Sequence, residues 1–118
     1  MNLVAFVGTD MENWGQITAL MHRMECEKVV LVCSSEAGAF PASEKCISVE
    51  VVGSSPIAAL KQQMIDVLKP HLGSDFEVAV SLASGTGKEH MALISALLQI
   101  PVGIRIAVYT KEGVQFLT

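Results

Sequence analysis

The stretch from Glu77 to Tyr109 constrains the fold of this chain more than any other segment. It opens with the alternating apolar residues of a strand, passes through the loop Ser84-Gly85-Thr86-Gly87-Lys88, and continues into the apolar run 91–98, which only Ser95 interrupts. A helix that is apolar on nearly every side is typically buried, so we predict a core helix at this run. Another strand follows, and strand, loop, helix and strand in this order are typical of a parallel α/β unit.

The loop between this strand and helix has the composition of an anion-binding site. Glycines let backbone N–H groups approach a phosphate, a helix start carries a partial positive charge, and Lys88 adds a full one. It is not a Walker A loop, because Leu82 and Glu89 stand where that pattern needs glycine and Ser or Thr. Two glycines are also one short of a dinucleotide fingerprint. A phosphate cradle and a tight turn that exposes a lysine both remain open.

The rest of the chain continues the alternation of strands and helices. We predict strands over 3–7, 28–33, 47–51, 78–82, 102–109 and 114–117, and helices over 14–24, 56–69 and 91–98. Pro70 and Gly73 should end the second helix, which a serine before Pro56 should cap. Residues 34–45 read as a loop, and Gly113 should take the left-handed position of a hairpin turn. This order predicts one α/β domain, 1–118, with a mostly parallel sheet and a C-terminal antiparallel β-hairpin.

Composition narrows the possible partners. Half of the residues are hydrophobic (51%) and only 17% are charged, so part of the surface is expected to be covered by a partner. The net charge of −4 argues against sequence-independent binding to a nucleic-acid backbone. No apolar run is long enough to span a membrane and no signal peptide is visible, so a cytoplasmic protein is expected. Three cysteines without CxxC spacing (Cys26, Cys33 and Cys46) predict free thiols and no metal site.

Two loops follow strands at positions where parallel sheets bind ligands. One is Gly8-Thr9-Asp10, whose Thr9 or Asp10 could also cap the next helix; the other is 84–88. No GxSxG, HExxH or Cys/His constellation appears anywhere in the chain. His90 reads as a polar residue near a helix start. The sequence thus indicates a binding site at two converging loops and no standard catalytic set.

These features resemble the CRISPR-associated Rossmann fold (CARF) family. The likeness is carried by the turn Val7-Gly8-Thr9-Asp10 after the first strand, by the Ser84–Lys88 loop, and by the strand and hairpin from Val102 to Leu117. It spans nearly the whole chain through short motifs. The family's loop more commonly reads Gly-Gly-Thr-Lys, whereas this chain has Gly-Thr-Gly-Lys.

The resemblance implies a Rossmann-like three-layer fold and a stand-alone twofold homodimer that binds cyclic oligoadenylate across its interface in CRISPR antiviral signalling. Members of the family commonly carry a DNA-binding or nuclease domain downstream, but this sequence ends at Thr118 inside the last strand, so no such domain is expected within it; no cofactor and no metal are expected either. The resemblance also implies the ligand-binding residues, with ring phosphates at the second loop and adenine or ribose at the first: Ser84, Gly85, Thr86, Gly87 and Lys88, and Gly8, Thr9 and Asp10. We expect Gly87, next to the helix start, to be the more sensitive of the two loop glycines.

Other functions stay open at this point. Some members of the family cut the cyclic ligand, for which Lys88 would stabilise charge, but only Asp10 and His90 offer a base, so catalysis is left undecided. An ordinary nucleotide or dinucleotide binder is another possibility, with Glu36 after the second strand as a ribose ligand. The last is an oligomerising scaffold without a small ligand.

Overall fold

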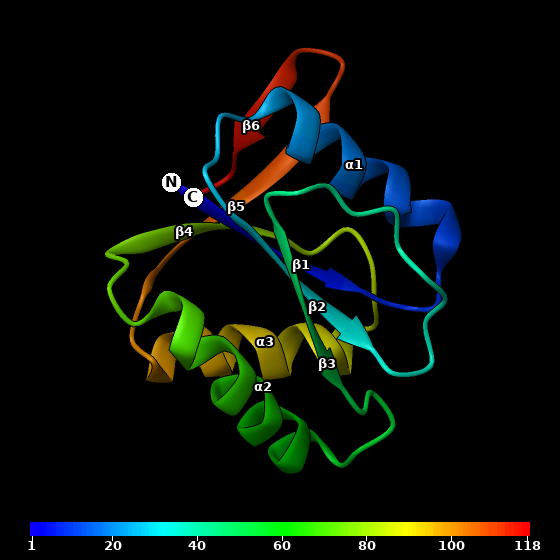
Figure 1. The fold of residues 1–118 in the computed structure, drawn as a ribbon, viewed down its shortest axis with the longest axis vertical. Helices are drawn as coiled ribbons and strands as arrows, with labels where there is room; N and C mark the ends of the chain where they lie inside the picture. The colour runs from blue at the N-terminus through cyan, green and yellow to red at the C-terminus, as the bar shows by residue number, and fades with distance from the viewer.

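A six-stranded sheet runs through the middle of the computed structural model, which describes residues 1–118 (Figure 1). Its order is β3-β2-β1-β4-β5-β6; the first five strands are parallel and β6 returns antiparallel to β5. The strands are β1 (Asn2–Val7), β2 (Val29–Ser34), β3 (Cys46–Val51), β4 (Glu77–Ser81), β5 (Gly103–Thr110) and β6 (Gly113–Phe116). The mostly parallel sheet and the terminal hairpin are confirmed. Gly113 has φ +99°, as the turn requires.

Helices cover both faces of this sheet and complete three layers. The short 3₁₀ helix η1 (Met11–Asn13) and α1 (Trp14–Arg23) lie on one face, and α2 (Ile57–Leu72) and α3 (Gly87–Gln99) lie on the other (Figure 1). Alternate residues of the strands therefore point into two separate apolar clusters. The central strands β1 and β2 are buried on both faces, which explains their continuous apolar sequences.

The connection from β2 to β3 has no helix, as predicted, and this leaves one part of the sheet thinly covered. Residues 35–45 form an irregular loop where a crossover helix would be usual. On β3, Val49 and Val51 pack toward α2 and α3, whereas Ser48 and Glu50 are exposed. The edge strand therefore offers polar side chains on the face that only the loop approaches.

The prediction of a helix buried on nearly every side over 91–98 was wrong. α3 is amphipathic: Met91 is 58% exposed and Leu98 is 63% exposed. Its buried residues form one stripe against the sheet and α2: Glu89, Ala92, Leu93, Ala96 and Leu97. A helix in an outer layer contacts the sheet along one stripe only, so its remaining apolar residues face outward.

The predicted end of α2 at Gly73 is confirmed, since Gly73 is its C-cap, but the predicted serine cap and the stop at Pro70 were wrong. Pro70 lies inside the helix, which continues to Leu72, and Pro56 itself is the N-cap without any side-chain cap. Leu68 and Leu72 are both buried, so the apolar stripe continues past the proline. Their packing outweighs the backbone hydrogen bond that a proline near the end of a helix removes.

Candidate functional site

The two predicted loops meet at one edge of the sheet. Because β1 and β4 are adjacent and parallel, their following loops leave at the same end. The Ser84 hydroxyl donates to Asp10 Oδ1 at 2.6 Å, and the Gly85 N–H donates to the same oxygen at 3.0 Å. The convergence expected from the fold is thus observed, and we call this contact the loop junction.

Ser84 is the centre of the loop junction. It is fully buried, and its hydroxyl oxygen also accepts the Gly8 N–H at 2.8 Å. Gly8 in turn accepts a hydrogen bond from the Trp14 indole at 3.0 Å, which ties the first loop to α1. One small hydroxyl of the second loop therefore satisfies both a buried backbone donor and a carboxylate oxygen of the first loop.

Glycine is required where the two loops touch. A Cβ on Gly8 would lie 2.8 Å from the Gly85 Cα, closer than real Cβ contacts. Gly85 has φ +104°, and its Cβ would lie 2.6 Å from the Phe6 ring. Gly87 opens α3 at an ordinary φ, with open space around it. The backbone constraint therefore lies at Gly85 and not at Gly87, while the greater sensitivity of Gly87 in ligand binding stays a prediction.

The Asp10 carboxylate is held ionised by its partners. Burial is the largest single influence and raises the pKa of Asp10. The hydrogen bonds from Asn13, Ser84 and the Gly85 N–H lower it, and together they outweigh burial, so the pKa lies below its usual value. Asn13 Nδ2 donates to Asp10 Oδ2 at 2.7 Å. No side chain at Asp10 or Asn13 caps the helices that follow. Asp10 acts across the junction instead.

The start of α3 is organised by a capping box. The Thr86 hydroxyl accepts from the Glu89 N–H at 3.3 Å, and the Glu89 carboxylate accepts from the Thr86 N–H at 2.8 Å. The box leaves the N–H groups of Gly87 and Lys88 without helical partners, as at any helix start. Lys88 extends across to the loop before α2, where Nζ donates to the Ser55 carbonyl at 2.9 Å.

A hollow of about 240 Å³, which we call the polar hollow, opens beside this helix start. It has no apolar lining: Thr9, Ser34, Glu36, Gly53, Ser54, Thr86, Lys88 and Glu89. Of the predicted site residues, Thr9, Thr86 and Lys88 line it, while Gly8, Asp10, Ser84 and Gly85 form the junction behind them. Glu36, raised only for the nucleotide-binding alternative, also lines it.

Some lining residues were not anticipated. The Thr86-x-x-Glu89 spacing is a capping-box signature, and it is the signal in the sequence from which Glu89 could have been predicted at the start of α3. Ser34 ends β2, and Gly53 and Ser54 follow β3; the parallel order brings them to the same edge, although no motif in the sequence indicated them as site residues. His90 lies beside the site, with Nε2 at 2.7 Å from the Ser84 carbonyl. Since a carbonyl only accepts, His90 donates there.

Other chemistry is sparse. No group of His, Cys, Asp and Glu is arranged to hold a metal ion, and none of the helices has the length and apolar character needed to cross a membrane. The three cysteines are free. Burial raises the pKa of the Cys33 thiol, and the nearby Glu50 carboxylate raises it further.

Comparison with known proteins bears on the fold. Six chains of solved structures match, among them Enterococcus italicus Csm6 bound to cyclic hexa-2'-fluoro-hexa-dAMP, with a TM-score of 0.58 and 15% sequence identity. The match covers 90% of this chain and 32% of the Csm6 chain, so the present chain corresponds to about one third of that protein. At 15% identity the likeness shows the fold alone, and it agrees with the Rossmann-like fold that the resemblance to the CARF family implied. No protein-family model and no curated protein matches the chain.

Proposed function

We propose that the chain binds a cyclic oligoadenylate at the polar hollow, which the loop junction supports from behind. The observation that carries this proposal is a lysine-bearing helix start beside a wholly polar hollow, at the sheet edge where parallel folds bind ligands. The fold is shared with a protein described as bound to a cyclic hexanucleotide of adenine. A ring of phosphates needs hydrogen-bond donors and a cation, which Lys88 and the α3 start supply here beside the Glu36 and Glu89 carboxylates.

Each residue has a role that its contacts support. The free N–H groups of Gly87 and Lys88 point from the helix start and can donate to a phosphate oxygen. Lys88 Nζ donates to the Ser55 carbonyl in this structure. On ligand binding it would donate to a charged phosphate oxygen in place of this neutral acceptor. Thr9 and Thr86 are exposed and supply hydroxyls. Asp10, Ser84 and Gly85 hold the two loops in place rather than contact the ligand.

We further propose that the active form is a twofold homodimer through the outer face of α3. This face carries the exposed Met91 and Leu98, and a mainly apolar hollow of about 460 Å³ is lined by Ile57, His90, Met91, Ile94 and Ser95. His90 connects this face directly to the Ser84 backbone of the junction. A twofold axis here would place two helix starts close together, suited to a ring of like charges.

Calorimetry tests the ligand. Cyclic tetra-adenylate, cyclic hexa-adenylate, linear hexa-adenylate and NAD are titrated into the protein; NAD is included because Glu36 lines the polar hollow. We expect a cyclic adenylate to bind most tightly. Lys88→Ala should weaken it by about 1.5–3 kcal/mol, the range for a hydrogen bond to a charged group. The matched control is Lys111→Ala, an exposed lysine on the hairpin. Preferred binding of NAD would support the nucleotide-binding alternative instead.

Sedimentation equilibrium at tens of micromolar tests the assembly. The wild-type chain should be a dimer, and Met91→Lys should make it a monomer, because a buried unpaired ammonium disrupts an apolar interface. Leu117→Lys is the control, since Leu117 is 65% exposed on the terminal hairpin and away from α3. A wild-type monomer would contradict the dimer. Dissociation by Leu117→Lys alone would place the interface on the hairpin.

A further inference from the structure

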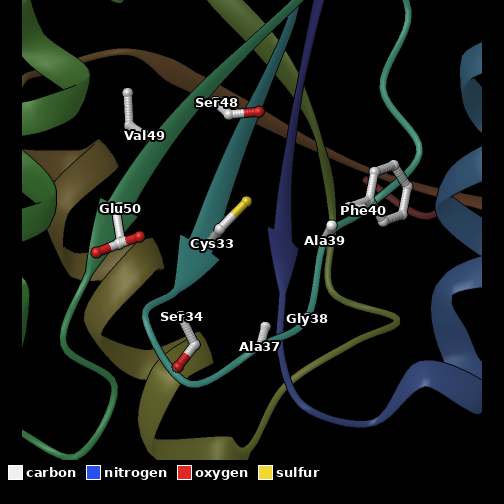
Figure 2. A pocket seen from close by; sticks show the side chains of 9 residues that line it. All are labelled: Cys33, Ser34, Ala37, Gly38, Ala39, Phe40, Ser48, Val49 and Glu50. Carbon is white, nitrogen blue, oxygen red and sulfur yellow. The ribbon is translucent and has the colours of Figure 1, made fainter.

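A second hollow, of about 370 Å³, lies beside the polar hollow; we call it the edge hollow. Its lining comes from β2, β3 and the loop between them: Cys33, Ser34, Ala37, Gly38, Ala39, Phe40, Ser48, Val49 and Glu50. Figure 2 shows Cys33, Ser48 and Glu50 on the two strands and Ala39 and Phe40 on the loop that passes beside them. Its volume falls near the lower end of the roughly 300–1,000 Å³ typical of small-molecule sites.

The edge hollow exists because the β2–β3 connection lacks a helix. The register pairs Cys33 with Glu50 and Leu31 with Ser48, so Cys33, Ser48 and Glu50 project from the same face. An ordinary crossover helix would cover these positions, whereas the loop approaches them only with small residues and Phe40. The Phe40 ring packs edge-on against Trp14, with centroids 5.3 Å apart, and this contact fixes the aromatic wall.

The lining selects for one kind of group. It contains one carboxylate and no cationic side chain, so it disfavours an anion. The alanines, glycine and Phe40 provide an apolar wall, while the exposed Ser48 and Glu50 provide polar atoms at the rim. Ser34 is already engaged, since its hydroxyl oxygen accepts the Glu36 N–H. A neutral, flat ring that carries an N–H donor complements this surface.

We propose that the edge hollow receives a nucleobase with an exocyclic amino group, and that the Glu50 carboxylate accepts a hydrogen bond from that amino group. Ser34 lines both hollows, and the short turn from Ser34 to Ala37 separates them. A nucleotide can therefore place its phosphate at Lys88 and its base over this turn. The inference rests on the proposed function and adds a specificity determinant: adenine is preferred over hypoxanthine, whose carbonyl oxygen would face the Glu50 carboxylate.

The test compares the tighter-binding cyclic adenylate with its inosine counterpart by calorimetry. The wild-type chain should prefer the adenylate by about tenfold or more, because a site that accepts a hydrogen bond from a ligand amino group rejects an analogue that lacks this donor. Glu50→Gln should reduce this preference to about threefold or less, since an amide can serve either base. Glu44→Gln, which removes the same charge from an exposed position in the loop just before β3, should leave it unchanged. Lys88→Ala should weaken both ligands equally.

A space-filling variant gives an independent readout. Ser48 is exposed on the edge strand, where an aromatic residue is compatible with β structure, so Ser48→Trp should fill the edge hollow without unfolding the chain. Adenylate affinity should fall about tenfold at an unchanged melting temperature. If Lys88→Ala weakens binding while Glu50→Gln keeps the adenine preference, or Ser48→Trp binds normally, the base site is overturned and the proposed function stands. If the wild-type chain binds neither cyclic ligand, both proposals are overturned.

Discussion

The loop junction and the edge hollow lie at the same end of the sheet but are built by opposite means. At the junction, a fully buried serine, a carboxylate and two glycines hold the β1 and β4 loops in direct backbone contact. At the edge hollow, β2 and β3 are joined by a long loop, and the side chains facing the space, Ser48 and Glu50, are exposed. The side chains of the loop junction are held in place by buried hydrogen-bond partners. Those of the edge hollow are held in place mainly by the backbone of β2 and β3.

This difference separates stability from recognition. Substitutions at the junction leave buried donors unpaired or force a Cβ into backbone, so they should act mainly on the free energy of unfolding. Substitutions at the edge hollow change exposed atoms and should act mainly on ligand affinity. The polar hollow lies between the two regions. The start of α3, which lines it, directly follows the loop junction. Each prediction below would break or sharpen this contrast.

Gly85→Val should have the largest effect on stability. A β-branched residue at φ +104° is strained, and its side chain would collide with Phe6, so we expect a loss of about 3 kcal/mol or more. Gly87→Val should cost less than about 1 kcal/mol, because its φ is ordinary and no atom crowds it. Urea denaturation of both variants measures the difference. Equal losses would show that the junction is not the constrained region.

Ser84→Ala should destabilise by about 2–3 kcal/mol. It removes the donor to Asp10 and leaves the buried Gly8 N–H without an acceptor. Ser35→Ala, an exposed serine in the β2–β3 loop, should change the unfolding free energy by less than about 0.5 kcal/mol. A small effect at Ser84 would mean that water replaces the hydroxyl, and the junction would then be no more rigid than the edge.

The sequence predicted the fold well because its signals were local. Apolar strands, the hairpin glycine and the helix-free 34–45 loop each depend on periodicity or turn chemistry within a few residues. The convergence of the loops at Thr9 and Lys88 followed from the parallel order alone. Exposure of Met91 and the passage of α2 through Pro70 could not be predicted, because both depend on which neighbours cover a helix. The edge hollow depends on register between strands, which a single sequence does not specify.

Thr86→Ala should cost about 1 kcal/mol, the usual value for loss of an N-cap side chain. Thr86→Ser should restore most of it, since the serine hydroxyl can accept the same Glu89 N–H. Thermal denaturation of both variants provides the measurement. A rescue by serine attributes the loss to capping. Should serine destabilise as much as alanine, the threonine methyl group and not the cap would support the start of α3.

The smallest expected effect is a pH dependence at Asp10. Its folded-state pKa lies below the ordinary value of 3.8, so the stability it contributes is present above that value and is lost as the pH falls through the folded-state pKa. Asp10→Asn keeps an oxygen for Ser84 and Gly85 but carries no charge, so it should lack this component. We expect the wild-type chain to be more stable than Asp10→Asn at pH 6, with the gap in urea midpoints closing as the pH falls below the ordinary value of 3.8 and through the folded-state pKa. The other carboxyl groups titrate in both proteins and cancel in this difference. A gap that stays constant with pH would show that the carboxylate charge does not stabilise the loop junction, and that its hydrogen bonds act through geometry alone.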